Sequence, residues 1–158
     1  MGMDKEAFLD AVHSNQGLIN KLCHIYRDSK EDREDLFQEI VYQLWKSHPK
    51  FRGRSKFTTW MYRIGLNTAM ASFRKPKVIL SGTDRLPEPT RPEGEENPNR
   101  ERLFKAIRTL DDAEKAIVSM YLDGFDNSEM AEVMGISKNY LGVRLNRIKN
   151  KLRTILNQ

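Results

Sequence analysis

The sequence predicts an all-α protein of two small helical domains joined by a flexible linker, with a helix-turn-helix in the C-terminal domain. Apolar residues recur at helical spacing in both parts of the chain, and no segment alternates as a convincing strand would. Between these parts, proline, glycine and acidic residues gather without periodicity. Near the C-terminus, a short amphipathic segment reaches a glycine and a longer basic one follows. We expect the first domain over 1–75, the linker over 76–98 and the second domain over 99–158.

In the first domain, periodicity predicts helices over residues 4–27, 30–47 and 55–74. The middle helix divides into an apolar half and a polar half. The apolar half consists of Leu36, Phe37, Ile40, Val41, Leu44 and Trp45. The polar half consists of Asp35, Gln38, Glu39, Tyr42, Gln43 and Lys46. The pattern alone indicates that this polar half is solvated, and His48 followed by Pro49 then ends the helix.

Aromatic and cationic residues are interleaved between positions 51 and 63, around a loop that contains a glycine. This pattern suits single-stranded nucleic acid, because bases stack on rings while cations hold the backbone. Helical spacing supports a second interpretation, in which at least two of Phe57, Trp60 and Ile64 belong to the core.

The expected linker has the composition of a flexible tether. Between Pro76 and Asn97 lie four prolines, two glycines and the acidic run Glu93-Gly94-Glu95-Glu96. Its apolar content is low and shows no period, so this segment is not expected to pack a core of its own.

An apolar stripe followed by a glycine marks the first helix of the expected helix-turn-helix. Gly135 can adopt the left-handed conformation that ends this helix, and Ile136 can pack under the turn. Ser137 can cap the next helix by accepting a hydrogen bond from one of its first amides. The stripe consists of Met130, Ala131, Val133 and Met134.

The helix after this turn is amphipathic and basic, and no acidic residue follows Glu132. One face, expected to be buried, carries Leu141, Leu145, Ile148, Leu152 and Ile155. The opposite face carries Asn139, Val143, Asn146 and Asn150, and the flanks carry Lys138, Arg144, Arg147, Lys149, Lys151 and Arg153. Asparagine and arginine can pair with adenine and guanine edges in the major groove. An ordinary helix with a solvated basic face is the alternative, but the turn, cap, apolar register and missing acids together favour DNA binding.

Composition narrows the class of protein further. The chain has 158 residues and a formal net charge of +5, and no acidic residue lies between Glu39 and Asp84. It has no apolar run of about 18 residues and no signal-peptide pattern, so we expect a soluble cytoplasmic protein without membrane insertion. The single Cys23 fits a reducing compartment. Cys23 and His24 lack a second cluster of ligands, so we expect a partly buried helical pair, with neither a metal nor a cofactor.

Three stretches together resemble the extracytoplasmic-function (ECF) subfamily of bacterial sigma-70-like RNA polymerase sigma factors. Asp35-Leu36-Phe37-Gln38-Glu39 with Leu44-Trp45 is similar to the family's core-polymerase-binding helix. The stretch from Phe51-Arg52-Gly53 to Trp60-Met61-Tyr62-Arg63-Ile64-Gly65-Leu66-Asn67 resembles its promoter-melting segment. Residues 131–152 resemble its second DNA-binding domain. The resemblance covers almost the whole chain, in order and at the expected spacing.

The resemblance implies a sigma factor that binds core RNA polymerase and directs initiation at promoters through their −10 and −35 elements. It implies contact with the polymerase clamp helices for Asp35, Gln38 and Glu39, and the flap of the large subunits as a further contact. It implies −10 recognition and melting for Arg52, Arg54, Lys56, Trp60, Arg63, Asn67 and Arg74, with the loop over 50–56 cradling a flipped base. It implies entry into the −35 major groove for Lys138, Asn139, Val143, Arg144 and Arg147. An anti-sigma factor is a further expected partner.

Two positions depart from the family's pattern. Phe37 stands where a smaller aliphatic residue is usual, a change that the core can absorb. Gly142 stands where a basic or polar residue is common, and a glycine inside a helix costs about 1 kcal/mol relative to alanine. Its missing side chain either lets the backbone approach a phosphate or leaves Val143 alone to reach a thymine methyl.

Two other classes of function fit the sequence less well. A small recombinase or nuclease needs clustered carboxylates or an activated nucleophile, but the basic stretches lack acids and the acidic run lacks histidine partners. A stand-alone repressor or activator needs a ligand-binding or dimerisation domain, which residues 1–75 do not resemble. The sequence therefore favours a binding module without catalysis of its own.

Overall fold

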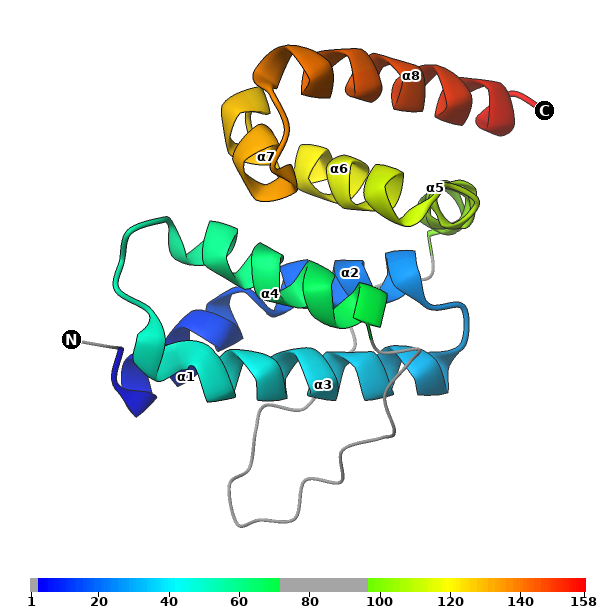
Figure 1. Cartoon of the computed structure of the whole chain (residues 1–158). Coiled ribbons are helices and arrows are strands. Elements are labelled where there is room, and N and C mark those ends of the chain that lie inside the picture. Colours follow the sequence, from blue (N-terminus) through cyan, green and yellow to red (C-terminus); the bar gives the residue numbers. More distant parts are fainter. Residues whose placement is uncertain (1–2, 72–96) are drawn as a thin grey trace. The chain divides into compact units, whose positions relative to one another are not determined.

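The computed structural model describes residues 3–71 and 97–158, and all regular structure within these ranges is helical (Figure 1). The predicted all-α class is therefore confirmed for the described residues. Contacts group the chain into two units. The first holds α1, most of α2, α3, η1 and α4, and the second holds α5 to α8 together with His24–Asp28.

The first unit is built from α1 (Lys5–Ser14), α2 (Gln16–Tyr26), α3 (Lys30–Ser47), the short 3₁₀ helix η1 (His48–Lys50) and α4 (Phe57–Ala71). Helix α3 packs along α4 and buries most of its predicted apolar half, Phe37 included. Trp45 is only half-buried, because its ring lies at the end of the helix, where it stacks on His48 and contacts Phe8. Met61, Tyr62 and Leu66 supply the buried face of α4.

The single helix predicted over residues 4–27 is wrong, because the chain breaks at Asn15 into α1 and α2. The Asn15 side-chain amide donates to the Ala11 carbonyl at 2.7 Å, and its own backbone N–H donates to the same oxygen. A local bond of this kind competes with continued helix. Helix α4 also begins later than predicted, at Phe57 rather than residue 55.

The second unit consists of α5 (Pro98–Arg108), α6 (Asp112–Leu122), α7 (Asn127–Met134) and α8 (Lys138–Leu156). Of the predicted linker, only Asn97 and Pro98 fall within the described residues; they begin α5, where the Asn97 side chain accepts from the Asn99 amide at 3.0 Å. Reciprocal capping boxes start α6, between Asp111 and Glu114, and α7, between Asp126 and Glu129. Local chemistry therefore defines where each of these helices starts.

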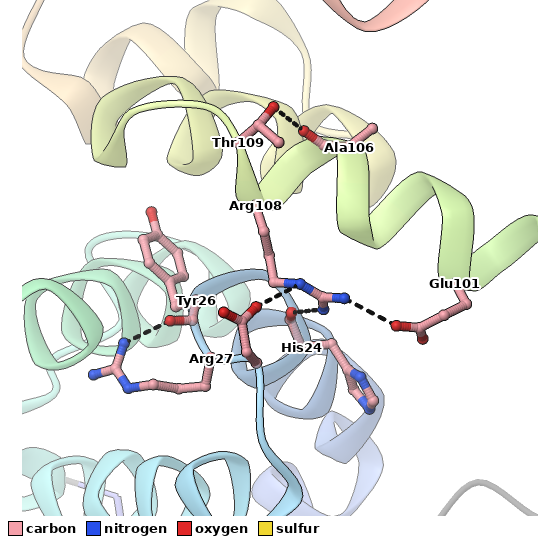
Figure 2. Close-up of polar contacts among 8 residues, drawn as sticks. His24, Tyr26, Arg27, Glu101, Ala106, Arg108 and Thr109 are labelled. Carbon is pink, nitrogen blue, oxygen red and sulfur yellow. Dashed lines mark hydrogen bonds and ion pairs between the residues drawn. The ribbon is translucent and has the colours of Figure 1, made fainter. Parts of the chain in front are cut away.

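Arg108, at the end of α5, ties the segment His24–Asp28 into the second unit (Figure 2). Its guanidinium donates to the His24 carbonyl at 2.7 Å and pairs with Asp28 and Glu101, each at 2.9 Å. The His24 ring stacks on Phe104.

The hydroxyl of Tyr26, in the same segment, donates to the Asp112 carbonyl at 2.9 Å. Burial, reinforced by the negative charge of Asp112, raises the pKa of this phenol far above its usual range, so the hydroxyl stays protonated.

Candidate nucleic-acid interface

The predicted turn between α7 and α8 is confirmed by its geometry. Gly135 adopts a left-handed conformation with φ +70°, and the Ile136 amide donates back to the Ala131 carbonyl at 3.1 Å. Ser137 caps α8, since its hydroxyl accepts from the Tyr140 amide at 3.1 Å. Met130 and Ala131 are buried beneath the turn, whereas Ile136 is half-buried. The turn thus fixes where α8 begins and which of its faces is available.

Helix α8 contacts α5, α6 and α7 through the face that the sequence predicts. Leu141, Leu145, Ile148 and Leu152 are buried, and Ile155 is half-buried near the end of the helix. This apolar seam holds α8 against the rest of the unit along most of its length. The opposite face is therefore a firmly supported surface.

The face predicted to enter the −35 major groove is open to solvent. Lys138, Asn139 and Arg147 are exposed, Val143 is 46% exposed, and Arg144 is half-buried on the flank of the helix. Asn146 and Asn150 are exposed on the same side. The amides and cations on this face can pair with base edges, and the exposed Val143 side chain can contact a thymine methyl. No carboxylate on α8 repels phosphate.

Gly142 lies in α8 beside the start of α7. A Cβ added there would meet only the Asn127 side-chain nitrogen within 4 Å, at 3.9 Å. That is an ordinary van der Waals distance, so packing within the described residues does not demand a glycine at this position.

The residues assigned to the −10 element gather on one loop and on the helix that follows it. Arg52, Arg54 and Lys56 are exposed on the loop between η1 and α4, where Arg52 donates to the Pro49 carbonyl at 3.3 Å. Trp60 and Arg63 are half-buried and Asn67 is exposed, at the i, i+3 and i+7 spacing of one face of α4. Arg74 lies outside the described residues.

Three aromatic rings join the two ends of this loop. Phe51 lies 5.0 Å from Trp60 and 5.9 Å from Phe57, and Phe57 lies 5.4 Å from Trp60, measured between ring centroids. All three rings are half-buried, as is Ile64. The expectation that at least two of Phe57, Trp60 and Ile64 lie in the core is therefore wrong. The buried face of α4 is supplied by Met61, Tyr62 and Leu66 instead, and the rings of Phe57 and Trp60 pack with Phe51 outside that face.

The residues assigned to core-polymerase binding lie on the polar half of α3. Asp35 and Gln38 are exposed, and Glu39 is half-buried, with its carboxylate accepting from the Gln43 side chain at 3.1 Å. The opposite half of α3 is packed against the unit's core, so these groups face away from it.

Sequence reasoning missed two aromatic side chains at these surfaces. Phe51 was identified only as part of an interleaved pattern, and nothing in its spacing shows that it contacts Trp60. Tyr140 is 46% exposed in the first turn of α8, although its position looks unremarkable between the polar and apolar faces. Exposure of a large ring is a property of the folded chain, which explains why sequence reasoning did not identify it.

Other kinds of site find no support within residues 3–71 and 97–158. No group of three potential metal ligands is present there, and Cys23, the single cysteine of the chain, is buried. None of the helices in these ranges combines the length and apolar character needed to cross a membrane.

Comparisons with known proteins agree with this layout. The sigma-70 region 2 family matches residues 11–77, and the sigma-70 region 4 family matches residues 100–152. The ECF RNA polymerase sigma-E factor of Escherichia coli K12 is 30% identical, over 97% of this chain and 90% of its own length. That of Haemophilus influenzae is 29% identical, over 97% of this chain and 91% of its own.

A solved structure shows the same fold. The sigma factor RpoE of Bartonella quintana, crystallised with the anti-sigma factor NepR, matches with a TM-score of 0.71 at 16% identity. The match covers 94% of this chain and 95% of that one. The folds, the helix-turn-helix and the two family matches define a sigma-70-type transcription initiation factor, a class without enzymatic activity of its own. Within that class, the chain belongs to the ECF sigma factors.

Proposed function

We propose that this ECF sigma factor binds core RNA polymerase in the cytoplasm and directs it to promoters, reading the −35 element with α8 and melting the −10 element with the loop before α4. The exposed face of α8 carries the proposal. It offers amide, cationic and methyl groups on a capped helix, and no carboxylate follows Glu132.

The −35 element is assigned to Lys138, Asn139, Val143, Arg144 and Arg147. A capped helix supported along its apolar face can enter a major groove without rearranging. Arginine and asparagine then discriminate bases, and the cationic side chains among these five residues also contact phosphates in a salt-dependent manner.

The −10 element is assigned to Arg52, Arg54, Lys56, Trp60, Arg63, Asn67 and Arg74. Three exposed cations on a short loop can hold the backbone of a separated strand. Holding one flipped base stabilises the open strand and offsets a few kcal/mol of unstacking. The half-buried Trp60 ring is expected to support this loop and to present one edge to the DNA.

Binding of core polymerase is assigned to the polar half of α3, where Asp35, Gln38 and Glu39 would face the polymerase clamp helices. The second unit is assigned to binding the flap of the polymerase large subunits. An anti-sigma factor is a further proposed partner, since the structurally similar RpoE was crystallised with one.

The first experiment mixes the purified chain with core RNA polymerase that lacks any sigma factor. Co-elution and specific initiation on some genomic promoters are expected. Footprinting of a palindrome by the chain alone, without co-elution, would instead indicate a repressor. Metal-dependent strand cleavage would indicate a DNA-processing enzyme.

A pair of variants separates the assigned roles. Arg144→Ala should weaken −35-dependent initiation and leave core binding intact, whereas Asp35→Ala should weaken core binding itself. Arg153→Ala is the matched control, because Arg153 is an exposed arginine further along the same helix. Loss of core binding in Arg144→Ala would refute this division of roles between the two units.

A further inference from the structure

Tyr140 is a large aromatic side chain to which the roles above assign nothing. It lies in the first turn of α8, and 46% of it is exposed, so it is not one of the buried core residues. Its backbone amide donates to the Ser137 hydroxyl at 3.1 Å, which fixes the start of its side chain at the N-terminus of the helix. A tyrosine has only two side-chain torsions, so it is a stiff group once its backbone is held.

The ring of Tyr140 lies beside Arg144, one helical turn further on. The guanidinium carbon of Arg144 is 5.9 Å from the ring centroid, within the range of a cation–π contact. Positions i and i+4 face each other on a helix, so this geometry needs no distortion.

The contact leaves the hydrogen-bonding edge of Arg144 available. Within residues 3–71 and 97–158, the Arg144 side chain has no ion pair or hydrogen bond, and the Tyr140 ring is its one cation–π partner. By comparison, the Arg108 guanidinium donates to three oxygens, from His24, Asp28 and Glu101. The aromatic ring contacts the face of the guanidinium plane. The N–H donors that pair with guanine lie along the edge of that plane and stay available.

We infer that Tyr140 is a positioning residue, which holds the Arg144 guanidinium in the orientation that reads a guanine in the −35 element. The inference rests on the proposed reading of that element by α8. Because a positioned arginine loses less freedom on binding, removing the ring should lower base discrimination rather than general affinity for DNA. A cation–π contact at an exposed site corresponds to about a two- to five-fold change in that discrimination.

The test uses the full chain bound to core RNA polymerase and a promoter library in which the −35 positions are randomised. Sequencing the transcripts gives the base preference at every position for each variant. Tyr140→Leu removes the ring, Tyr140→Phe keeps the ring without its hydroxyl, and Arg144→Ala removes the reader. Tyr121→Leu is the matched control, because Lys149 lies over the similarly exposed Tyr121 ring at 4.4 Å, away from the first turn of α8.

We expect Tyr140→Leu to lower the base preference by about two- to five-fold at the same −35 position at which Arg144→Ala lowers it. Tyr140→Phe and Tyr121→Leu should resemble the wild type, and Tyr140→Leu combined with Arg144→Ala should lose no more than Arg144→Ala alone. An unchanged preference in Tyr140→Leu, a uniform fall across all sequences, or additive losses in the double variant would each overturn the inference. A wild-type protein without any −35 preference would instead refute the proposed function.

Discussion

Replacing Gly142 with alanine should stabilise the second unit, although the substitution falls within the surface assigned to DNA. Gly142 is an internal residue of α8, where alanine is favoured over glycine by about 0.8–1 kcal/mol. The added Cβ would come no closer than 3.9 Å to the Asn127 side chain, so no clash offsets this gain. For a unit of this size, the gain corresponds to a rise in Tm of about 4–8 °C.

The measurement is thermal and urea unfolding of the full chain, monitored by far-UV circular dichroism and by tryptophan fluorescence. Both tryptophans, Trp45 and Trp60, belong to the first unit, so the fluorescence transition should not change. Gly124→Ala is the matched control with the opposite expected sign. It has nothing within 4 Å of an added Cβ, but its φ of +83° should cost an alanine about 1 kcal/mol or more.

Two results would contradict this reasoning. If Gly142→Ala unfolds at the same or a lower urea concentration while Gly124→Ala behaves as expected, α8 is not a regular, unobstructed helix at Gly142. If the fluorescence transition moves as well, the substitution acts beyond the second unit.

Three further substitutions test individual contacts. Asp126→Ala removes the cap of α7 and should lower the free energy of unfolding of the second unit by about 1 kcal/mol, measured by urea denaturation. Lys151→Met leaves the buried Glu114 carboxylate without its cation at 2.7 Å and should cost about 1–2 kcal/mol by the same assay, with Glu114→Gln recovering much of the loss in the double variant. Phe51→Ala removes two ring contacts from the cluster before α4; tryptophan emission should shift to the red, and promoter opening, followed by permanganate reactivity, should fall while core binding remains.

Of the helices of the second unit, α7 and α8 were predictable because their signals are local, whereas α5 and α6 were not predicted individually. A stripe, a glycine and a capping serine specify α7, the turn and the start of α8 within a dozen or so residues. The break at Asn15 was not predictable from periodicity. Both sides of it keep apolar positions in helical register, and only the competing amide bond to Ala11 separates them.

In the candidate site, the sequence predicts which residues face solvent but not which exposed side chains contact each other. Which residues of α8 face solvent follows from its buried seam, so Asn139 and Val143 could be placed from the sequence alone. Contacts between exposed side chains could not, because they depend on rotamers that no spacing rule fixes. Phe51 against Trp60 and Tyr140 against Arg144 belong to this second kind.

Gly142→Ala also decides between two interpretations of the missing side chain on the side of α8 assigned to DNA. Packing within the described residues tolerates a methyl group there, so a loss of −35-dependent initiation with core binding intact would indicate the contact with DNA. If the backbone at Gly142 approaches a phosphate, the alanine variant should lose −35-dependent initiation at every sequence alike, in spite of its greater stability.

If the glycine only leaves Val143 to reach a thymine methyl, initiation by Gly142→Ala should equal that of the wild type. In that case, replacing the thymine by uracil should weaken the wild type and Gly142→Ala equally, but not Val143→Ala. A selective change at one base pair in Gly142→Ala would contradict both interpretations.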